Sequence, residues 1–168
     1  CSIHETTAAG ARGFYVIAAS GTAAEISNNV AYGIIGVQFG NIATTGTSVF
    51  DSNLSMRCTV AGFAFVDVGG TITNNISTSN TTSGFTVSES ATATIGTFSG
   101  NTAHSNTTDG FIITLVANGT MSNITSWRNN SDGMTFDPES GEINLITATL
   151  FGNTVSNLAL LGTTGFGK

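Results

Sequence analysis

Residues 110–113 read Gly110-Phe111-Ile112-Ile113, a glycine followed by an aromatic residue and by a second apolar residue two positions later. Four further segments share this form: Gly13-Phe14-Tyr15-Val16, Gly62-Phe63-Ala64-Phe65, Gly84-Phe85-Thr86-Val87 and Gly133-Met134-Thr135-Phe136. A weaker copy starts at Gly33, and the gaps between successive glycines are 20, 29, 22, 26 and 23 residues. A repeat of about two dozen residues predicts an architecture of stacked, similar units.

Two columns of asparagine appear when the chain is aligned on these glycines. The column four positions before the glycine contains Asn29, Asn80, Asn106, Asn129 and Asn153, with Cys58 in the remaining place. The column nine positions before the glycine contains Asn53, Asn75 and Asn101. Asparagine pairs with backbone groups and, like glycine, tolerates a left-handed backbone, so both columns and the glycines are expected at sharp corners. The asparagines are predicted to form ladders of side-chain amides.

The apolar residues between the corners indicate short strands. They alternate with polar residues at period two and are bounded by Gly, Asn, Ser and Thr. Coils that pair as parallel strands place equivalent residues about 4.8 Å apart. Phe63, Phe85 and Phe111 are therefore expected to stack inside an all-β solenoid.

In these columns the chain resembles the right-handed parallel β-helix repeat proteins, which include pectate lyases, polygalacturonases and phage tailspikes. The resemblance covers nearly the whole chain. It implies a single-stranded right-handed parallel β-helix of about seven coils that forms one domain over residues 1–168. The resemblance indicates no particular activity, because glycine and asparagine columns are features of a fold that proteins of many functions share.

Both ends of the chain fall inside a coil of this alignment. Residues 158–160 supply a first strand, and residues 161–168 supply no return strand. Open coils expose unpaired backbone and core, so a solenoid needs a cap or a continuation at each end. The sequence therefore predicts a segment of a longer protein, or a subunit that associates with its own copies end to end.

The composition argues against several partners. The chain has 4 basic and 10 acidic residues and a net charge of −6, so we expect no basic face for nucleic acid. It contains no apolar run long enough for a membrane span. No cofactor and no metal site is predicted. Sparse charge with abundant threonine and asparagine is commoner in exported β-solenoids, so the expected location is extracellular or surface-exposed.

Asp109 and Asp132 are the strongest catalytic candidates. Each precedes a repeat glycine, so their carboxyl groups are expected about 5 Å apart on successive coils, close to the separation in retaining glycosidases. The segment around Asp109 faintly resembles the polygalacturonase Asn-Thr-Asp-Gly motif, although the other motifs of that family are absent. The favoured alternative makes both aspartates turn residues of Asp-Gly pairs.

Trp127 and Arg128 are the candidate carbohydrate-binding residues, because an indole can stack on a sugar ring. A packing role for Trp127 is equally open. Seven Asn-x-Ser/Thr sequons occur, and five of them fall in the two asparagine columns, where an inward amide is out of reach of a transferase. Asn118 and Asn123 are therefore the predicted glycosylation sites.

These features favour a structural or adhesive β-solenoid of an exported protein, on a cell or a virion, that presents a sheet face to glycans or to other subunits and can build fibres. The alternative is a polysaccharide-cleaving glycosidase fragment that uses Asp109 and Asp132. Whether the chain is an enzyme stays open, with a non-enzyme favoured. A third hypothesis is a surface-binding threonine array made of the pairs Thr71 and Thr73, Thr92 and Thr94, and Thr147 and Thr149, which the uneven repeat spacing is expected to disrupt.

Overall fold

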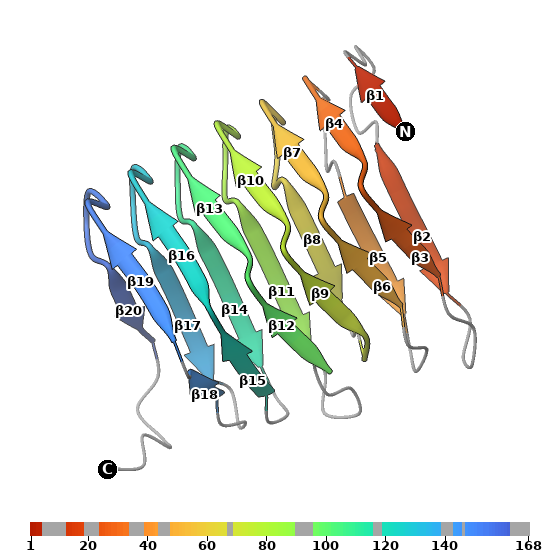
Figure 1. Ribbon diagram of the computed structural model, residues 1–168. Coiled ribbons are helices and arrows are strands. Elements are labelled where there is room, and N and C mark those ends of the chain that lie inside the picture. The colour runs from red at the N-terminus through yellow and green to blue at the C-terminus, as the bar shows by residue number, and fades with distance from the viewer. Residues whose placement is uncertain are drawn as a thin grey trace.

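The computed structural model is a stack of strands that advances along one axis from the N-terminal end to the C-terminal end (Figure 1). It describes residues 1–4, 13–18, 24–33, 39–43, 48–66, 69–89, 96–115, 119–138, 143–145 and 147–161. Every element within these ranges is a β-strand. The strands form three sheets, which we call A, B and C.

Each coil contributes its strands to these sheets in turn. Sheet A contains β1 (Ser2–His4), β4 (Val30–Tyr32), β7 (Leu54–Met56), β10 (Ile76–Thr78), β13 (Thr102–His104), β16 (Ile124–Trp127) and β19 (Ala148–Phe151). Sheet B contains β2 (Phe14–Ala18), β5 (Phe39–Ala43), β8 (Phe63–Val66), β11 (Phe85–Glu89), β14 (Phe111–Leu115), β17 (Met134–Pro138) and β20 (Leu158–Leu160). Sheet C contains β3 (Glu25–Ser27), β6 (Val49–Asp51), β9 (Thr71–Thr73), β12 (Thr97–Ser99), β15 (Gly119–Ser122) and β18 (Ile143–Leu145).

All pairing in the three sheets is parallel and joins strands of successive coils. Phe85 of β11 pairs with Phe63 of β8 on one side and with Phe111 of β14 on the other. Equivalent residues of neighbouring coils therefore lie directly above one another. The predicted all-β parallel solenoid is confirmed, and so is the resemblance to β-helix proteins at the level of the fold.

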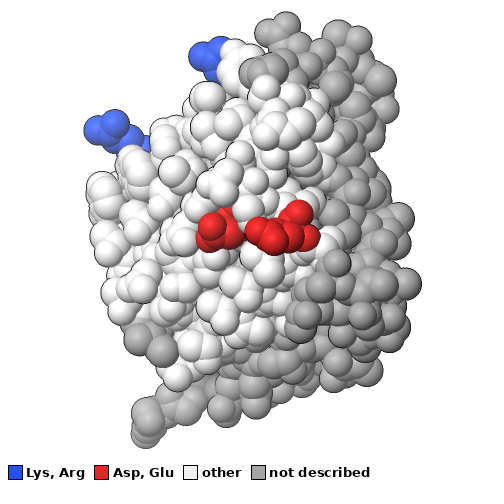
Figure 2. All heavy atoms as spheres, turned by 45° about the vertical axis from the view of Figure 1, so that its right-hand side comes forward, with Lys and Arg blue, Asp and Glu red and all other residues white. Residues whose placement is uncertain are grey.

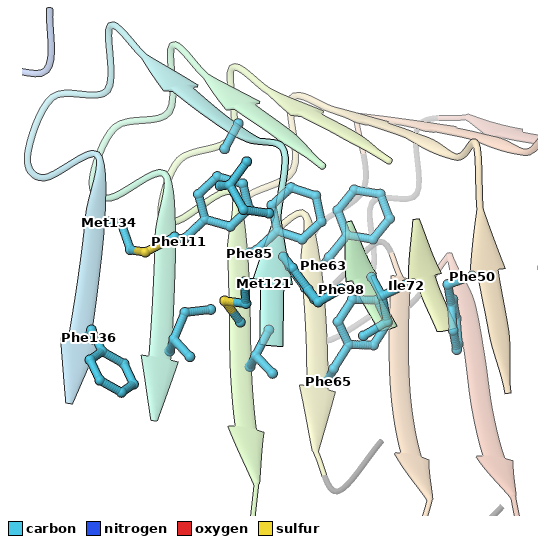
Figure 3. Packing of buried hydrophobic residues seen from close by; sticks show 14 of the residues in the cluster. Phe50, Phe63, Phe65, Ile72, Phe85, Phe98, Phe111, Met121, Met134 and Phe136 are labelled. Atoms are coloured by element: carbon cyan, nitrogen blue, oxygen red, sulfur yellow. The ribbon is translucent and has the colours of Figure 1, made fainter. Parts of the chain in front are cut away.

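The interior is an aromatic stack between the sheets (Figure 3). The rings of Phe63 and Phe85 lie 4.6 Å apart at 6°, and those of Phe85 and Phe111 lie 4.8 Å apart at 12°. Phe98 of sheet C packs edge-on against Phe85 and Phe111, with centroids 6.1 Å away. All four side chains are fully buried, which confirms the predicted internal column. Stacked and edge-on rings add to the stabilisation that their buried area provides.

Two left-handed corners flank the strands of sheet A. The corner residues have φ between +53° and +68°, and the two corners of a coil are five residues apart: Asn28 and Gly33, Ser52 and Arg57, Asn74 and Ser79, Gly100 and Ser105, Asn123 and Arg128. Each corner residue comes one position before an asparagine-column position. The expectation that the column asparagines themselves adopt the left-handed backbone is therefore wrong, because the turn is made one residue earlier.

The repeat glycines are required for space and not for a left-handed backbone. A Cβ atom on Gly110 would lie 2.5 Å from the carbonyl oxygen of Gly133 and 2.8 Å from Nδ2 of Asn129. A Cβ on Gly84 would lie 2.6 Å from the Gly110 carbonyl oxygen. Real Cβ atoms do not approach backbone this closely, so a larger residue at Gly84 or Gly110 would force the following coil to shift.

The alignment of the second coil needs a correction. Phe39, and not the segment after Gly33, pairs with Phe14 and Phe63 in sheet B. Gly33 is a left-handed corner, with φ +66°. Asn29 therefore belongs to the column of Asn53. The alignment of Gly33 failed because the connections between sheets B and C vary in length. The distance from a corner to sheet B is constant: in each of the five coils with two corners, the second corner lies six residues before the first residue of the sheet B strand.

Candidate binding surface

The first asparagine column forms a hydrogen-bonded ladder. Oδ1 of Asn53 accepts the backbone N–H of Asn29 at 3.0 Å and its Nδ2 at 3.2 Å. Asn75 holds Asn53 in the same way, at 3.0 Å for both bonds. Asn101 in turn holds Asn75, at 3.0 and 3.1 Å. Each amide thus satisfies a corner N–H that no sheet bond reaches.

The second column forms a separate ladder toward the C-terminal end. Oδ1 of Asn106 accepts the backbone N–H and Nδ2 of Asn80, both at 3.1 Å. Oδ1 of Asn129 accepts the same two bonds from Asn106, and Oδ1 of Asn153 accepts them from Asn129. All four distances lie between 2.9 and 3.1 Å. At the other end the N–H of Cys58 donates to Asn80 at 2.7 Å. The predicted ladder residues are thus placed, with Asn29 moved to the first ladder.

The structure brings Asp109 and Asp132 together on successive coils. Oδ1 of Asp109 accepts the backbone N–H of Asp132 at 2.9 Å. Oδ1 of Asp132 accepts the backbone N–H of Ser156 at 2.9 Å and its hydroxyl at 2.6 Å. Each carboxylate therefore supports the corner of the next coil. Neither Asp-Gly pair forms a left-handed turn, because none of these four residues has a positive φ.

The last residues of six sheet A strands form a column in which four of the six side chains carry rings. The column, which we call the ring strip, is paired in register from strand to strand and consists of Tyr32, Met56, Thr78, His104, Trp127 and Phe151. The rings of His104 and Trp127 stack with centroids 4.3 Å apart at 12°. Those of Trp127 and Phe151 are 6.0 Å apart at 3°. Trp127 therefore has a ring next to each of its faces.

Two arginines border the ring strip, because they occupy left-handed corners directly after it. Arg57 lies 5.5 Å from the centre of the Tyr32 ring and donates from Nη1 to the Tyr32 hydroxyl at 2.6 Å. Arg128 follows Trp127 and is exposed. The positively charged side chains project from the margin of the face in Figure 2, away from the acidic group in its middle. Three coils separate the two arginines, or about 14 Å at the spacing of paired strands.

The surroundings of His104 in this strip favour its neutral form. Partial burial lowers its pKa from the ordinary value of 6.5, and the positive charge of Arg128 lowers it further. Its Nδ1 atom lies 3.1 Å from the hydroxyl of Thr78 and 3.3 Å from that of Ser105. The ring is therefore fixed by both stacking and hydrogen bonds.

Sheet C presents hydroxyl groups outward. Thr71 pairs with Thr97, Thr73 with Ser99, and Ser99 with Ser122, whose hydroxyl donates to that of Ser99 at 2.9 Å. The threonine pairs singled out in the sequence do not form this row, because Thr149 lies in β19 of sheet A, and Thr92 and Thr94 lie outside the described residues. The strands of sheet C nevertheless keep their register, because the extra residues lie in the connections between sheets B and C.

Asp51 is the acidic neighbour of this array. It accepts the hydroxyl of Thr73 at 2.6 Å, the hydroxyl of Ser52 at 2.9 Å and Nδ2 of Asn74 at 3.0 Å. These bonds favour the charged form of Asp51 and lower its pKa below the ordinary value of 3.8. The hydrogen bond from Thr73 has the largest effect.

Six of the seven sequon asparagines lie among the described residues. The ladder asparagines that form part of a sequon are at most 1% exposed: Asn53, Asn75, Asn80, Asn106 and Asn129. Asn123 is exposed at a left-handed corner, with φ +53°. Asn118 lies outside the described residues.

Sequence reasoning singled out Trp127 and Arg128 but not four residues that share their surface: Tyr32, Arg57, His104 and Phe151. Each precedes or occupies a left-handed corner that comes six residues before the first residue of a sheet B strand. An alignment based on that constant distance would have placed all six residues in two adjacent columns.

Comparison of the chain with protein-family models, with curated proteins and with solved structures found no match. The described residues include no helix that is long and apolar enough to cross a membrane. Among those same residues, no group of three or more His, Cys, Asp or Glu side chains is placed to hold a metal ion.

Proposed function

We propose that the chain is a structural and adhesive solenoid of an exported or surface protein, and that it binds a glycan at the ring strip of sheet A. The observation that carries this proposal is the outward stack of His104, Trp127 and Phe151 beside the exposed Arg128. Aromatic rings offer apolar area with little conformational freedom to lose, and a guanidinium offers a planar set of donors.

The ladders support this role because they fix the rows on which the strip is built. His104 and Trp127 follow the buried Ala103 and Ser126 of sheet A, and the ladder asparagines lie two residues further along each chain segment. A ligand that touches the strip therefore meets side chains in fixed positions, which lowers the entropy lost on binding. Because both faces of Trp127 lie next to rings, a sugar would contact its edge and the outer face of Phe151.

The same geometry supports a non-enzymatic role over the glycosidase alternative. Asp109 and Asp132 each use Oδ1 to hold the backbone of the following coil, which gives both carboxylates a structural role. The activities of pectate lyases and polygalacturonases are therefore not part of this proposal.

Glycan-array binding of the labelled chain tests the proposal. We expect at least one glycan to bind, and Trp127→Ala and Arg128→Gln each to weaken that binding by about tenfold or more, as for central interface residues. Thr97→Ala, on the outward face of sheet C, should bind as the unchanged chain does. Circular dichroism confirms that each variant is folded. Absence of binding across the array, or equal binding by Trp127→Ala, would overturn the proposal.

A further inference from the structure

Threonines form a second column on the outward face of sheet A, in three strands whose last residues belong to the ring strip. The column consists of Thr102 of β13, Thr125 of β16 and Thr149 of β19. The three residues are paired in register on neighbouring strands (Figure 1). The column therefore repeats at the spacing of paired strands, about 4.8 Å.

Each threonine stands beside a ring on its own strand. In β16, Thr125 and Trp127 flank the fully buried Ser126. Alternate side chains of a strand point to opposite faces, so the hydroxyl and the indole share the outward face, about 7 Å apart along the strand. The register of β13 and β19 with β16 repeats this arrangement on both neighbours.

The hydroxyl groups of this column are available to a ligand. Thr102, Thr125 and Thr149 make no side-chain hydrogen bond with any other described residue. On sheet C, by contrast, the hydroxyl of Thr73 donates to Asp51 at 2.6 Å. A threonine hydroxyl without an internal partner offers one donor and two acceptor positions.

The column is bounded on the side of the earlier coils by aliphatic residues. Val30, Leu54 and Ile76 occupy the equivalent register positions on β4, β7 and β10. Strands β13, β16 and β19 are thus three neighbouring strands on which rings and threonine hydroxyls lie together.

We propose that the glycan binds across both columns as an extended chain along the solenoid axis, with its hydroxyl groups bonded to Thr102, Thr125 and Thr149. This inference rests on the proposed function and names the ligand class, a linear polysaccharide of extended conformation. The C–H groups of a sugar can pack against ring edges while hydroxyls at its rim bond to threonine. Successive units of an extended chain meet the same pair of side chains on successive coils, and a few well-placed polar groups fix such a ligand in register.

Binding of defined oligosaccharides tests the ligand class. The probes are oligomers of two to six units from the cello, xylo and chito series, which are extended, and from the malto series, which coils. At least one extended series should bind, with an affinity that rises with length until the three rows are covered. The malto series should bind about tenfold more weakly, because a coiled chain loses the hydrogen bonds of all but one row.

Thr125→Val tests the threonine column itself. Loss of one neutral hydrogen bond should weaken binding about three- to tenfold. Valine keeps the β-branched shape that suits a strand, and circular dichroism confirms that the variant is folded. Thr125→Ser keeps the hydroxyl and should bind as the unchanged chain does. Thr97→Val, the same change on the outward face of sheet C, should also leave binding unchanged.

The proposed function and this inference fail in different ways. If Trp127→Ala weakens binding whereas Thr125→Val does not, the ring strip is a binding site and the threonine column is not part of it. Equal weakening by Thr125→Val and Thr125→Ser, or equal binding of the malto and extended series, would also overturn the inference alone. Absence of binding to every glycan would overturn both.

Discussion

Within the described part of the chain, the hydroxyl of Ser55 lacks the hydrogen bonds that its counterpart in the next coil makes. Its counterpart Ser77 accepts a hydrogen bond from Nδ2 of Asn80 at 2.8 Å and donates to the Gly84 carbonyl at 2.9 Å. Ser55 is buried, and its hydroxyl has no hydrogen-bond partner among the described residues. The residue three positions after it is Cys58, where the later coil has asparagine. A buried hydroxyl without a partner is destabilising.

Replacing Cys58 with asparagine should stabilise the protein. The new Nδ2 would donate to Ser55, as Asn80 donates to Ser77, and the gain in unfolding free energy should be about 1 kcal/mol. Chemical denaturation measures this change. Cys58→Ala is the control, because it offers no donor and should not stabilise. If Cys58→Asn is no more stable than Cys58→Ala, the explanation for Ser55 is wrong.

At the scale of the element, the ladders hold corners that the sheets cannot hold. Sheet bonds fix the strands, but each left-handed corner turns a backbone N–H out of the sheet. The asparagine of the next coil accepts that N–H, so neighbouring corners are stable only together. Sheet A strands between two such corners have as few as three residues, and their stability comes from this pairing as well as from the core.

Asn106→Ala should therefore lower the unfolding free energy by about 1 to 3 kcal/mol, because it leaves buried groups of the Asn80 corner without an acceptor. Oδ1 of Asn106 accepts both the N–H and Nδ2 of Asn80, at 3.1 Å. Thr81→Ala, at an exposed position next to the ladder, should change stability by little. Urea unfolding compares the two. Negligible losses at both positions would show that the ladder bonds contribute nothing net.

At the scale of the whole molecule, two groups make stability depend on pH. The pKa of His104 is lowered by burial and then by Arg128, and that of Asp51 is lowered mainly by the Thr73 hydroxyl. Each folded pKa lies below the unfolded one, so each contribution is present above the unfolded pKa and is lost as pH falls through the folded pKa. The window of His104 begins at about pH 6.5 and that of Asp51 at about pH 3.8.

Unfolding free energy should accordingly decline as pH is lowered from 7 to 5, and His104→Gln should flatten this decline. In a chain that keeps His104, Arg128→Gln should raise the pKa of His104, because it removes a neighbouring positive charge. The pKa should stay below 6.5, because the burial of the ring remains. Urea unfolding at several pH values and NMR titration of the His104 ring measure the two effects. Equal pH slopes for the chain and His104→Gln would contradict the assignment.

The sequence was sufficient to predict the solenoid, the phenylalanine stack, the two asparagine columns and the adjacency of Asp109 and Asp132. All of these follow from local spacing, because strands that pair in register convert a repeat in sequence into a column in space. Inward and outward positions alternate along each strand, so the period of two separated core from surface. Position within the repeat was enough for each of these features.

Register and surface partners required the tertiary structure. Connections between sheets B and C vary in length, so counting residues placed Asn29 in the wrong column. Contacts between coils also explain why the repeat glycines are glycines, since the obstructing atoms belong to the following coil. The ring strip joins His104, Trp127 and Phe151 across successive coils that lie 23 to 24 residues apart in the chain. Their stacking depends on which coil lies next to which, and only the pairing of the strands decides that.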